Sequence, residues 1–234
     1  MKNFLKKIKK IKSTKNSEPI PKHFHMKKAR LEALTDGVFS ILMTLIVFEI
    51  KAPVLSIFDA NNPAILWAEL FKYSSLFIGY IITFAVLAMF WLNHHFIMYV
   101  FTKNINRVFI QLNVVFLALL SFIPFSSSLL GNYLNNPLAV AIFGINILVV
   151  GILSYYMFLY ILHSPNIENK EVPNKTITKR KIRHQVTIVS TVIGIILCFV
   201  NPSISLIFYL IPVFFNNIPG ALSAIERIFD FEIE

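Results

Sequence analysis

Six long apolar runs divide this chain, and they restrict its fold more than any other feature. The runs cover about residues 31–50, 70–100, 108–131, 138–162, 185–201 and 203–219. A helix of about 20 apolar residues crosses a hydrocarbon core about 30 Å thick, and each run has roughly that length or more. With 56% hydrophobic residues, the chain is too apolar for a soluble domain of 234 residues. The sequence predicts an all-α, polytopic membrane protein with six transmembrane helices.

The boundary between the fifth and sixth runs rests on one dipeptide, Asn201-Pro202. A proline can kink one long helix as well as end it. The combined run exceeds 30 residues, however, which is too long for one simple span. We therefore expect a tight hairpin at this point.

The placement of lysine and arginine predicts the orientation in the membrane. If the N-terminus is cytoplasmic, every one of the 22 lysines and arginines except Lys51 and Lys72 falls on the cytoplasmic side. This asymmetry follows the positive-inside rule and places both termini in the cytoplasm. We expect a basic cytoplasmic N-terminal segment (1–28), a transmembrane domain (29–220) and a short cytoplasmic C-terminal tail (221–234), in a multi-pass protein of the cell membrane.

The net charge of +10 follows the membrane side, so it does not indicate binding to nucleic acid. In the N-terminal segment, apolar residues separated by lysines recur at Phe4, Leu5, Ile8 and Ile11. This spacing suits a short helix on the anionic lipids of the inner leaflet. A disordered basic tail that only helps to set the topology fits equally well.

The first apolar run carries an acidic residue, Asp36, inside a predicted span. A carboxylate at membrane depth costs a few kcal/mol unless a partner or water meets it, so such residues usually serve a function. Ser40 and Thr44 follow Asp36 at intervals of four and extend a polar stripe. Beside them Ile41, Leu45 and Phe48 form an apolar stripe, which would also fit a plain helix-packing surface.

Polar residues of the second and third spans are expected at the same depth as Asp36, near the cytoplasmic face. We predict that they form one hydrogen-bonded cluster with the start of the first helix: Arg30, Asp36, Trp91, Asn93, His94, His95 and Asn113. Adjacent helical side chains point about 100° apart, so at most one of the two histidines can join it. Neither an HExxH motif nor a cysteine pair is present, and we expect no metal site and no cofactor.

Catalytic motifs are missing from the sequence. It contains no GxSxG, no P-loop and no glycine-rich nucleotide loop. We therefore expect that the protein is not an enzyme. It also lacks a TVGYG-like filter, so we expect no re-entrant pore loop.

Three segments resemble the prokaryotic potassium channels related to transmembrane protein 175. These are the first-helix run that begins R30-L-E-A-L-T-D36, the motif W91-L-N-H-H95, and the third-helix pattern from Leu112 to Phe125. The family hallmark is an Arg, three variable residues and then Phe-Ser-Asp; here Leu34 and Thr35 replace the Phe and Ser. The resemblance covers about residues 28–131 well and the rest mainly through topology.

The resemblance implies a potassium-permeable channel made of four six-helix subunits, with the first helix of each subunit lining a central pore. It implies apolar constriction rings at Ile41, Leu45 and Phe48, with Thr44 as a neighbouring polar ring. Arg30 and Asp36 would brace the helix, and potassium ions would be the permeant species. Phe48 is bulkier than the aliphatic residue common in the family, and a ring of four could narrow the pore.

Two other functions fit the sequence. A proton-coupled or small-solute transporter would use Asp36 with His94 or His95 as a proton relay. A membrane scaffold that transports nothing would use its basic tail. Measurements of passive potassium flux and of proton-dependent uptake separate these possibilities.

Overall fold

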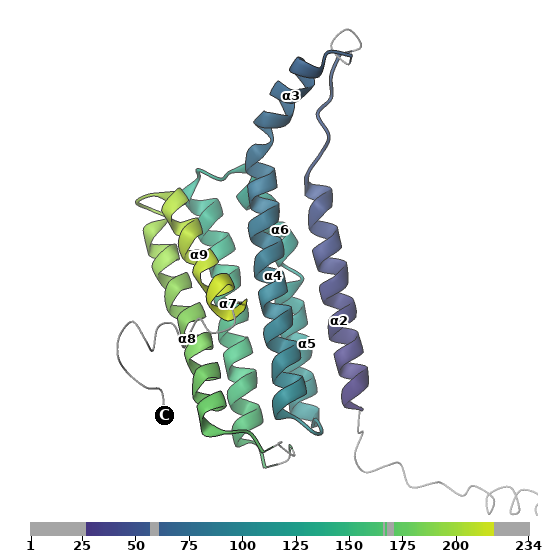
Figure 1. Ribbon diagram of the computed structural model, residues 1–234, viewed down its shortest axis with the longest axis vertical. Helices are drawn as coiled ribbons and strands as arrows, with labels where there is room; N and C mark the ends of the chain where they lie inside the picture. The colour runs from purple at the N-terminus through teal and green to yellow at the C-terminus, as the bar shows by residue number, and fades with distance from the viewer. Residues whose placement is uncertain (1–26, 57–60, 166, 168–170, 218–234) are drawn as a thin grey trace, which may run out of the picture.

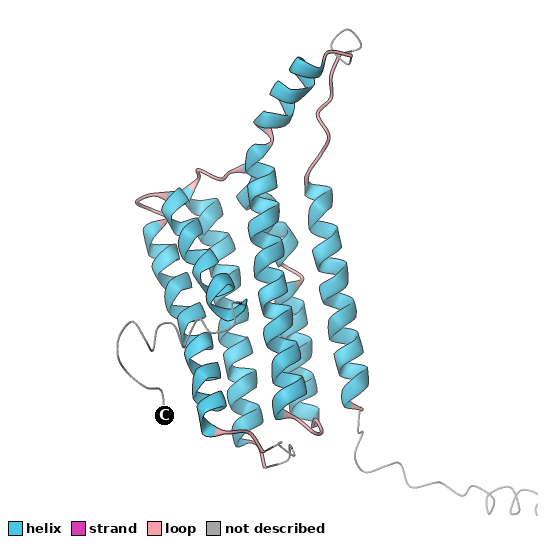
Figure 2. Cartoon of the chain, viewed as in Figure 1, coloured by secondary structure: helices cyan, strands magenta, loops and turns pink. Residues whose placement is uncertain are grey.

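The computed structural model describes residues 27–56, 61–165, 167 and 171–217, and in this part the chain forms a bundle of helices (Figure 1; Figure 2). In chain order the helices are α2 (Lys28–Leu45), the 3-10 turn η1 (Ile46–Glu49), α3 (Pro63–Lys72), α4 (Ser74–Phe101), α5 (Arg107–Leu120), α6 (Ile123–Asn132), α7 (Pro137–His163), α8 (Asn174–Leu197) and α9 (Pro202–Asn217). The N-terminal helix expected on the inner leaflet and the C-terminal tail lie outside the described residues.

Four helical segments are long and apolar enough to cross a membrane. They are Lys28–Glu49, Ser74–Phe101, Arg107–Asn132 and Pro137–His163, and they match the first four predicted spans closely. Helix α8 begins well before the fifth apolar run, so its first turns are basic. Helix α9 has 16 residues, fewer than a simple span needs. The last two spans and the orientation of the bundle remain predictions.

Asparagine and proline explain where several helices begin. The side chains of Asn62, Asn106 and Asn136 each accept a hydrogen bond from a backbone N–H in the first turn of the helix that follows. Pro63 and Pro137 occupy the first helical position, where the missing N–H costs nothing. The turn at 198–201 separates α8 from α9, as predicted from Asn201-Pro202.

The third apolar run is interrupted near its middle, which the apolar pattern did not predict. Helix α5 ends at Leu120 and α6 starts at Ile123, with Pro124 in the first turn of α6. Proline cannot donate a backbone hydrogen bond, so the helix cannot continue unbroken through this position. The hydroxyl of Ser121 donates to the Leu117 carbonyl at 2.9 Å, and this carbonyl also accepts from the backbone N–H of Ser121 at 3.0 Å.

Aromatic side chains fill the core, and small residues allow close contact between helices. Phe39, Phe90, Phe116 and Tyr209 belong to the largest fully buried side chains. A Cβ atom on Gly79 of α4 would lie 3.0 Å from the backbone of Gly131 in α6, so these helices approach too closely for a larger residue. The bundle is therefore tightly packed around α4, with α2 at its edge (Figure 1).

Candidate functional site

Helix α2 has two faces with different surroundings. The inner face, which packs on the bundle, carries the buried residues Leu31, Thr35, Phe39, Leu42 and Ile46. The outer face carries Ile41, Thr44, Leu45 and Phe48, and the three apolar members are 58%, 45% and 74% exposed. The family resemblance implied that these four residues line a pore, and the structure places them together on one exposed stripe of a single subunit.

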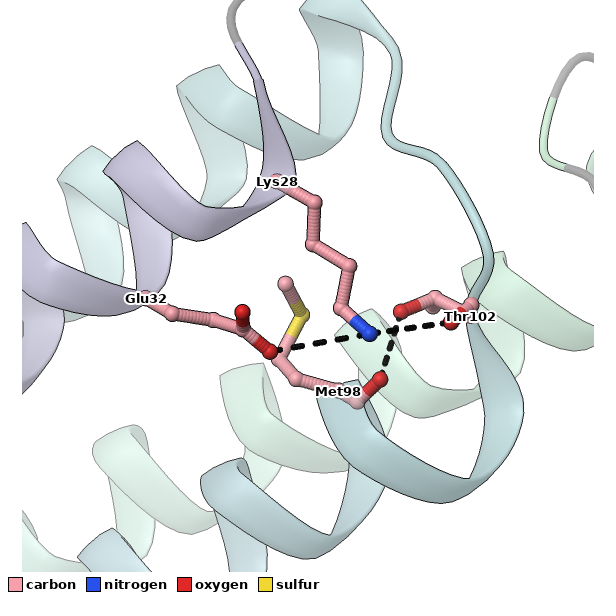
Figure 3. A network of polar contacts seen from close by, with 4 residues as sticks. All are labelled: Lys28, Glu32, Met98 and Thr102. Atoms are coloured by element: carbon pink, nitrogen blue, oxygen red, sulfur yellow. Dashed lines mark hydrogen bonds and ion pairs between the residues drawn. The ribbon is translucent and has the colours of Figure 1, made fainter.

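The start of α2 is attached to the end of α4 through Lys28 (Figure 3). The Lys28 ammonium donates to the backbone carbonyl of Thr102 at 3.0 Å and lies 3.6 Å from the Glu32 carboxylate. The hydroxyl of Thr102 in turn donates to the Met98 carbonyl at 2.7 Å. The lysine therefore neutralises a carboxylate on its own helix and also satisfies a carbonyl at the C-terminus of a neighbouring one.

Asp36 contacts the second predicted cluster segment through Trp91. The indole Nε1 of Trp91 donates to Asp36 Oδ1 at 2.9 Å, which joins α2 to α4. Arg30, the predicted brace, is exposed, and the described residues show no polar contact of its side chain with Asp36. The described partner of the Asp36 carboxylate is thus the neutral indole N–H of Trp91. A hydrogen bond to a carboxylate is stronger than a hydrogen bond between two neutral groups.

A second hydrogen-bonded chain joins three helices below the inner face of α2. Asn113 of α5 donates from Nδ2 to Thr35 Oγ1 at 2.9 Å, and its Oδ1 lies 2.8 Å from His94 Nε2. Because an amide oxygen only accepts, the Nε2 of His94 carries the hydrogen in this arrangement. All three side chains are buried. Losing either of these hydrogen bonds would leave a buried polar group without its partner, which lowers the stability of the fold.

His94 and His95 have different surroundings, as expected for adjacent helical residues. His94 stacks on Phe116 at a ring distance of 5.7 Å inside the bundle. His95 is exposed and stacks between Trp91 and Tyr99, at 5.9 and 6.2 Å. Of the two histidines, His94 is the one that shares hydrogen bonds with the cluster.

The far end of the α2–η1 segment is held by a carboxylate. Glu49 accepts a hydrogen bond from the Ser128 hydroxyl of α6 at 2.6 Å. The sequence analysis did not consider Glu49, although it lies near the end of the first apolar run. With Lys28 at one end and Glu49 at the other, the segment is held along its whole length.

The polar side chains of the outer face bond only to their own helix in the described contacts. Ser40 donates to the Asp36 carbonyl at 2.8 Å, and Thr44 donates to the carbonyls of Ser40 and Ile41 at 3.0 and 2.9 Å. A hydroxyl that donates in this way keeps its acceptor lone pairs. The Thr44 oxygen can therefore still accept from water or coordinate a cation on the exposed side.

Asn93 joins a contact that the sequence analysis missed. Arg180 of α8 donates from Nη1 to Asn93 Oδ1 at 2.6 Å, and its guanidinium carbon lies 3.9 Å from the centre of the Phe96 ring. Arg180 stands in a basic run that indicated only membrane orientation. Arg180 differs from the neighbouring basic residues in being buried. A run of basic residues in the sequence does not show which of them is buried.

Comparisons with known proteins identify the family of this chain. The family model described as endosomal/lysosomal potassium channel TMEM175 matches residues 30–124. A protein from Chryseobacterium sp. strain P1-3 named a potassium channel is 30% identical over 79% of this chain and 89% of its own length. The mouse protein named endosomal/lysosomal proton channel TMEM175 is 23% identical over 77% of this chain and 35% of its own length.

The fold is also that of a solved structure. A crystal structure of a lysosomal potassium-selective channel TMEM175 homolog from Chamaesiphon minutus matches with a TM-score of 0.69 at 22% identity, covering 80% of this chain and 95% of the other. Among the residues that the structure describes, four helical segments are long and apolar enough to span a membrane. The chain is therefore a multi-pass integral membrane protein that belongs to the TMEM175 family.

Proposed function

We propose that the chain forms a potassium-permeable cation channel whose pore is lined by the outer face of α2. The observation that carries this proposal is the contrast on α2: one face is fixed to the bundle by hydrogen bonds, and the other exposes three large apolar side chains. A relative that covers most of the chain is named a potassium channel, which supports potassium as the permeant ion.

The exposed stripe acquires a function in a homotetramer. Four copies arranged around an axis, each with α2 facing inward, bring the four outer faces together. Ile41, Leu45 and Phe48 then form three apolar rings about one helical turn apart. An apolar ring of small diameter blocks ions because it excludes water, and it conducts when it widens.

Selectivity in this pore comes from ring diameter and from hydroxyl oxygens. The four Thr44 side chains lie between the apolar rings and offer oxygen lone pairs to a partly dehydrated cation. No cofactor takes part, and the potassium ions are the transported species. Phe48 is the largest and most exposed of the ring residues, so its ring adds a further narrowing after the ring of Ile41.

The inner-face hydrogen bonds determine the ring diameters. Asp36 and Trp91 fix the distance between α2 and α4 near the start of the pore helix. The Thr35–Asn113–His94 chain fixes the rotation of α2, since a turn of α2 about its axis would break it. Asp36 therefore acts as a positioning residue and does not itself bind the ion.

Purified protein in liposomes tests the proposal. We expect passive potassium flux down a gradient, without a requirement for protons, and a mass in detergent that corresponds to four chains. A protein that is monomeric or dimeric, or liposomes without potassium flux, would contradict the channel. An absence of both potassium flux and proton-dependent uptake would favour the scaffold.

Proton transport is the second candidate, because the mouse relative is named a proton channel. The relay predicted for a transporter requires proton exchange between Asp36 and a histidine. In the structure Asp36 bonds to Trp91 while His94 bonds to Asn113, so the two groups have separate partners. Proton flux that disappears in Asp36→Asn, with potassium flux absent from the native protein, would favour this function.

A further inference from the structure

A pocket of about 380 Å³ opens between α4, α8 and α9, away from the outer face of α2. Its walls include Asn93 and Phe96 of α4, and Thr176, Lys179, Arg180 and Arg183 of α8. Asn216, at the end of α9, closes one side. Three of the described lining residues are cationic and none is acidic.

The difference in length between α8 and α9 explains why the pocket exists. Helix α8 has 24 residues and α9 has 16, and the two run antiparallel from the turn at 198–201. The first turns of α8 therefore extend past the end of α9 (Figure 1). Arg183 donates to the Asn216 carbonyl at the end of α9, and beyond this contact α8 faces the pocket.

Arg180 contributes a buried positive charge to the pocket and has no acidic partner among the described residues. It is 6% exposed, and its described partners are neutral: the Asn93 amide oxygen and the Phe96 ring. A buried cation is costly unless an anion compensates it. Each guanidinium has five N–H donors in a fixed planar arrangement that matches the oxygens of a phosphate. Arg180 and Arg183 each use one of these donors in a described hydrogen bond, to Asn93 and Asn216.

We propose that this pocket binds the phosphate group of an anionic ligand between Arg180, Arg183 and Lys179. The ligand is either the headgroup of an anionic phospholipid or a soluble phosphate. The pocket is lined by the first turns of α8. Helices α8 and α2 begin at the same end of the bundle, which the positive-inside rule predicts to face the cytoplasm (Figure 1). Basic pockets between membrane helices on that side bind phospholipid headgroups. Leu92 and Phe96 offer apolar surface beside the cations for the glycerol and first acyl carbons.

Lipid titration of the full-length protein in detergent, followed by native mass spectrometry, tests the pocket. The probes are phosphatidylglycerol and phosphatidylcholine, with inorganic phosphate added separately and followed by thermal shift. We expect phosphatidylglycerol to bind more tightly than phosphatidylcholine. Lys179→Gln and Arg183→Gln should each weaken phosphatidylglycerol binding about five-fold, the effect of one basic residue near an anionic lipid surface.

Lys175→Gln is the matched control, because it removes the same charge from an exposed position one turn before Lys179. It should change binding less than two-fold, and the basic N-terminal segment contributes equally to all variants. Arg183→Lys keeps the charge and should retain more affinity than Arg183→Gln, which separates lost binding from lost folding.

Each outcome decides the proposal. Pocket-dependent binding of phosphatidylglycerol but not of inorganic phosphate identifies a lipid site, and pocket-dependent stabilisation by inorganic phosphate identifies a soluble ligand. The proposal is overturned if the pocket variants bind like Lys175→Gln, or if phosphatidylcholine binds as tightly as phosphatidylglycerol.

Discussion

The inner and outer faces of α2 are built from similar residues but have opposite surroundings. On the inner face, Thr35 bonds to a side chain of another helix, and Asp36 at its border does the same. On the outer face, the hydroxyls of Ser40 and Thr44 bond to carbonyls of α2 itself. The inner face thus makes its contacts within one subunit, whereas the described side chains of the outer face make no hydrogen bonds to another helix and are available for contacts outside the subunit.

This contrast separates two kinds of mutational effect. Substitutions on the inner face should change the stability of the subunit first, and ion flux only as a consequence. Substitutions on the outer face should change ion flux while the isolated subunit keeps its stability. The predictions below test this separation, starting with the largest expected loss of stability.

Replacing Asn113 with Leu should have the largest effect. It leaves Thr35 Oγ1 and His94 Nε2 buried without their described partner. Each stranded group costs about 1–3 kcal/mol, so the free energy of unfolding should fall by about 2–6 kcal/mol. Thermal and denaturant unfolding in detergent measure it. Val115→Ala, at a position 51% exposed on the same helix, is the control and should cost well under half as much.

The pair Leu42→Asn and Ile41→Asn compares the two faces directly. Leu42 is 5% exposed, and replacing it should cost about 2–5 kcal/mol or more, because a core contact is lost and an amide is buried. Ile41→Asn should leave stability nearly unchanged but wet the constriction, so that cation flux rises or loses selectivity. Equal changes in selectivity at both positions would disprove the assignment of the pore face.

The apolar runs predicted the first four spans, but not which side chains of neighbouring helices lie opposite each other. The residues of the first run left open whether the stripe of Ile41, Leu45 and Phe48 is buried, and only the family resemblance implied that it faces a pore. Helical geometry within one segment predicted that at most one of His94 and His95 joins the cluster. The same geometry explains why Arg30 does not reach Asp36: six residues apart on a helix, their side chains point about 120° from each other.

The pattern of apolar and polar residues does not show which side chains of neighbouring helices form hydrogen bonds with each other. The hydrogen bonds from Trp91 to Asp36, from Ser128 to Glu49 and from Lys28 to Thr102 depend on how neighbouring helices are shifted along and rotated about their axes. The separate helix α3 and the break between α5 and α6 were also missed, since both lie within or beside continuous apolar runs. The basic residues that line the pocket were interpreted only as a topology signal.

Asp36 should show a smaller effect than Asn113, because its partner Trp91 is only partly buried. Asp36→Ala strands the indole N–H and should cost about 1–3 kcal/mol, whereas Asp36→Asn keeps an acceptor and should cost less than about 1 kcal/mol. A double-mutant cycle with Trp91→Phe should give a coupling energy of about 0.5–3 kcal/mol. An Asn variant that is stable and tetrameric but carries no flux would count against the channel and favour a proton carrier.

The smallest effect is expected at the far end of the α2–η1 segment, where Ser128 donates to Glu49. Ser128→Ala removes one partly buried hydrogen bond to a carboxylate and should lower stability by about 0.5–2 kcal/mol.

Ser121→Ala is the matched control, because its hydroxyl bonds to a carbonyl of its own helix, Leu117, and joins no second helix. The two variants lose the same atom, so a difference in flux between them reports on the position of η1. Because Phe48 lies in η1 beside Glu49, Ser128→Ala should change potassium flux while Ser121→Ala should not. Identical flux from both would show that the far end of α2–η1 does not need its link to α6 to set the last ring.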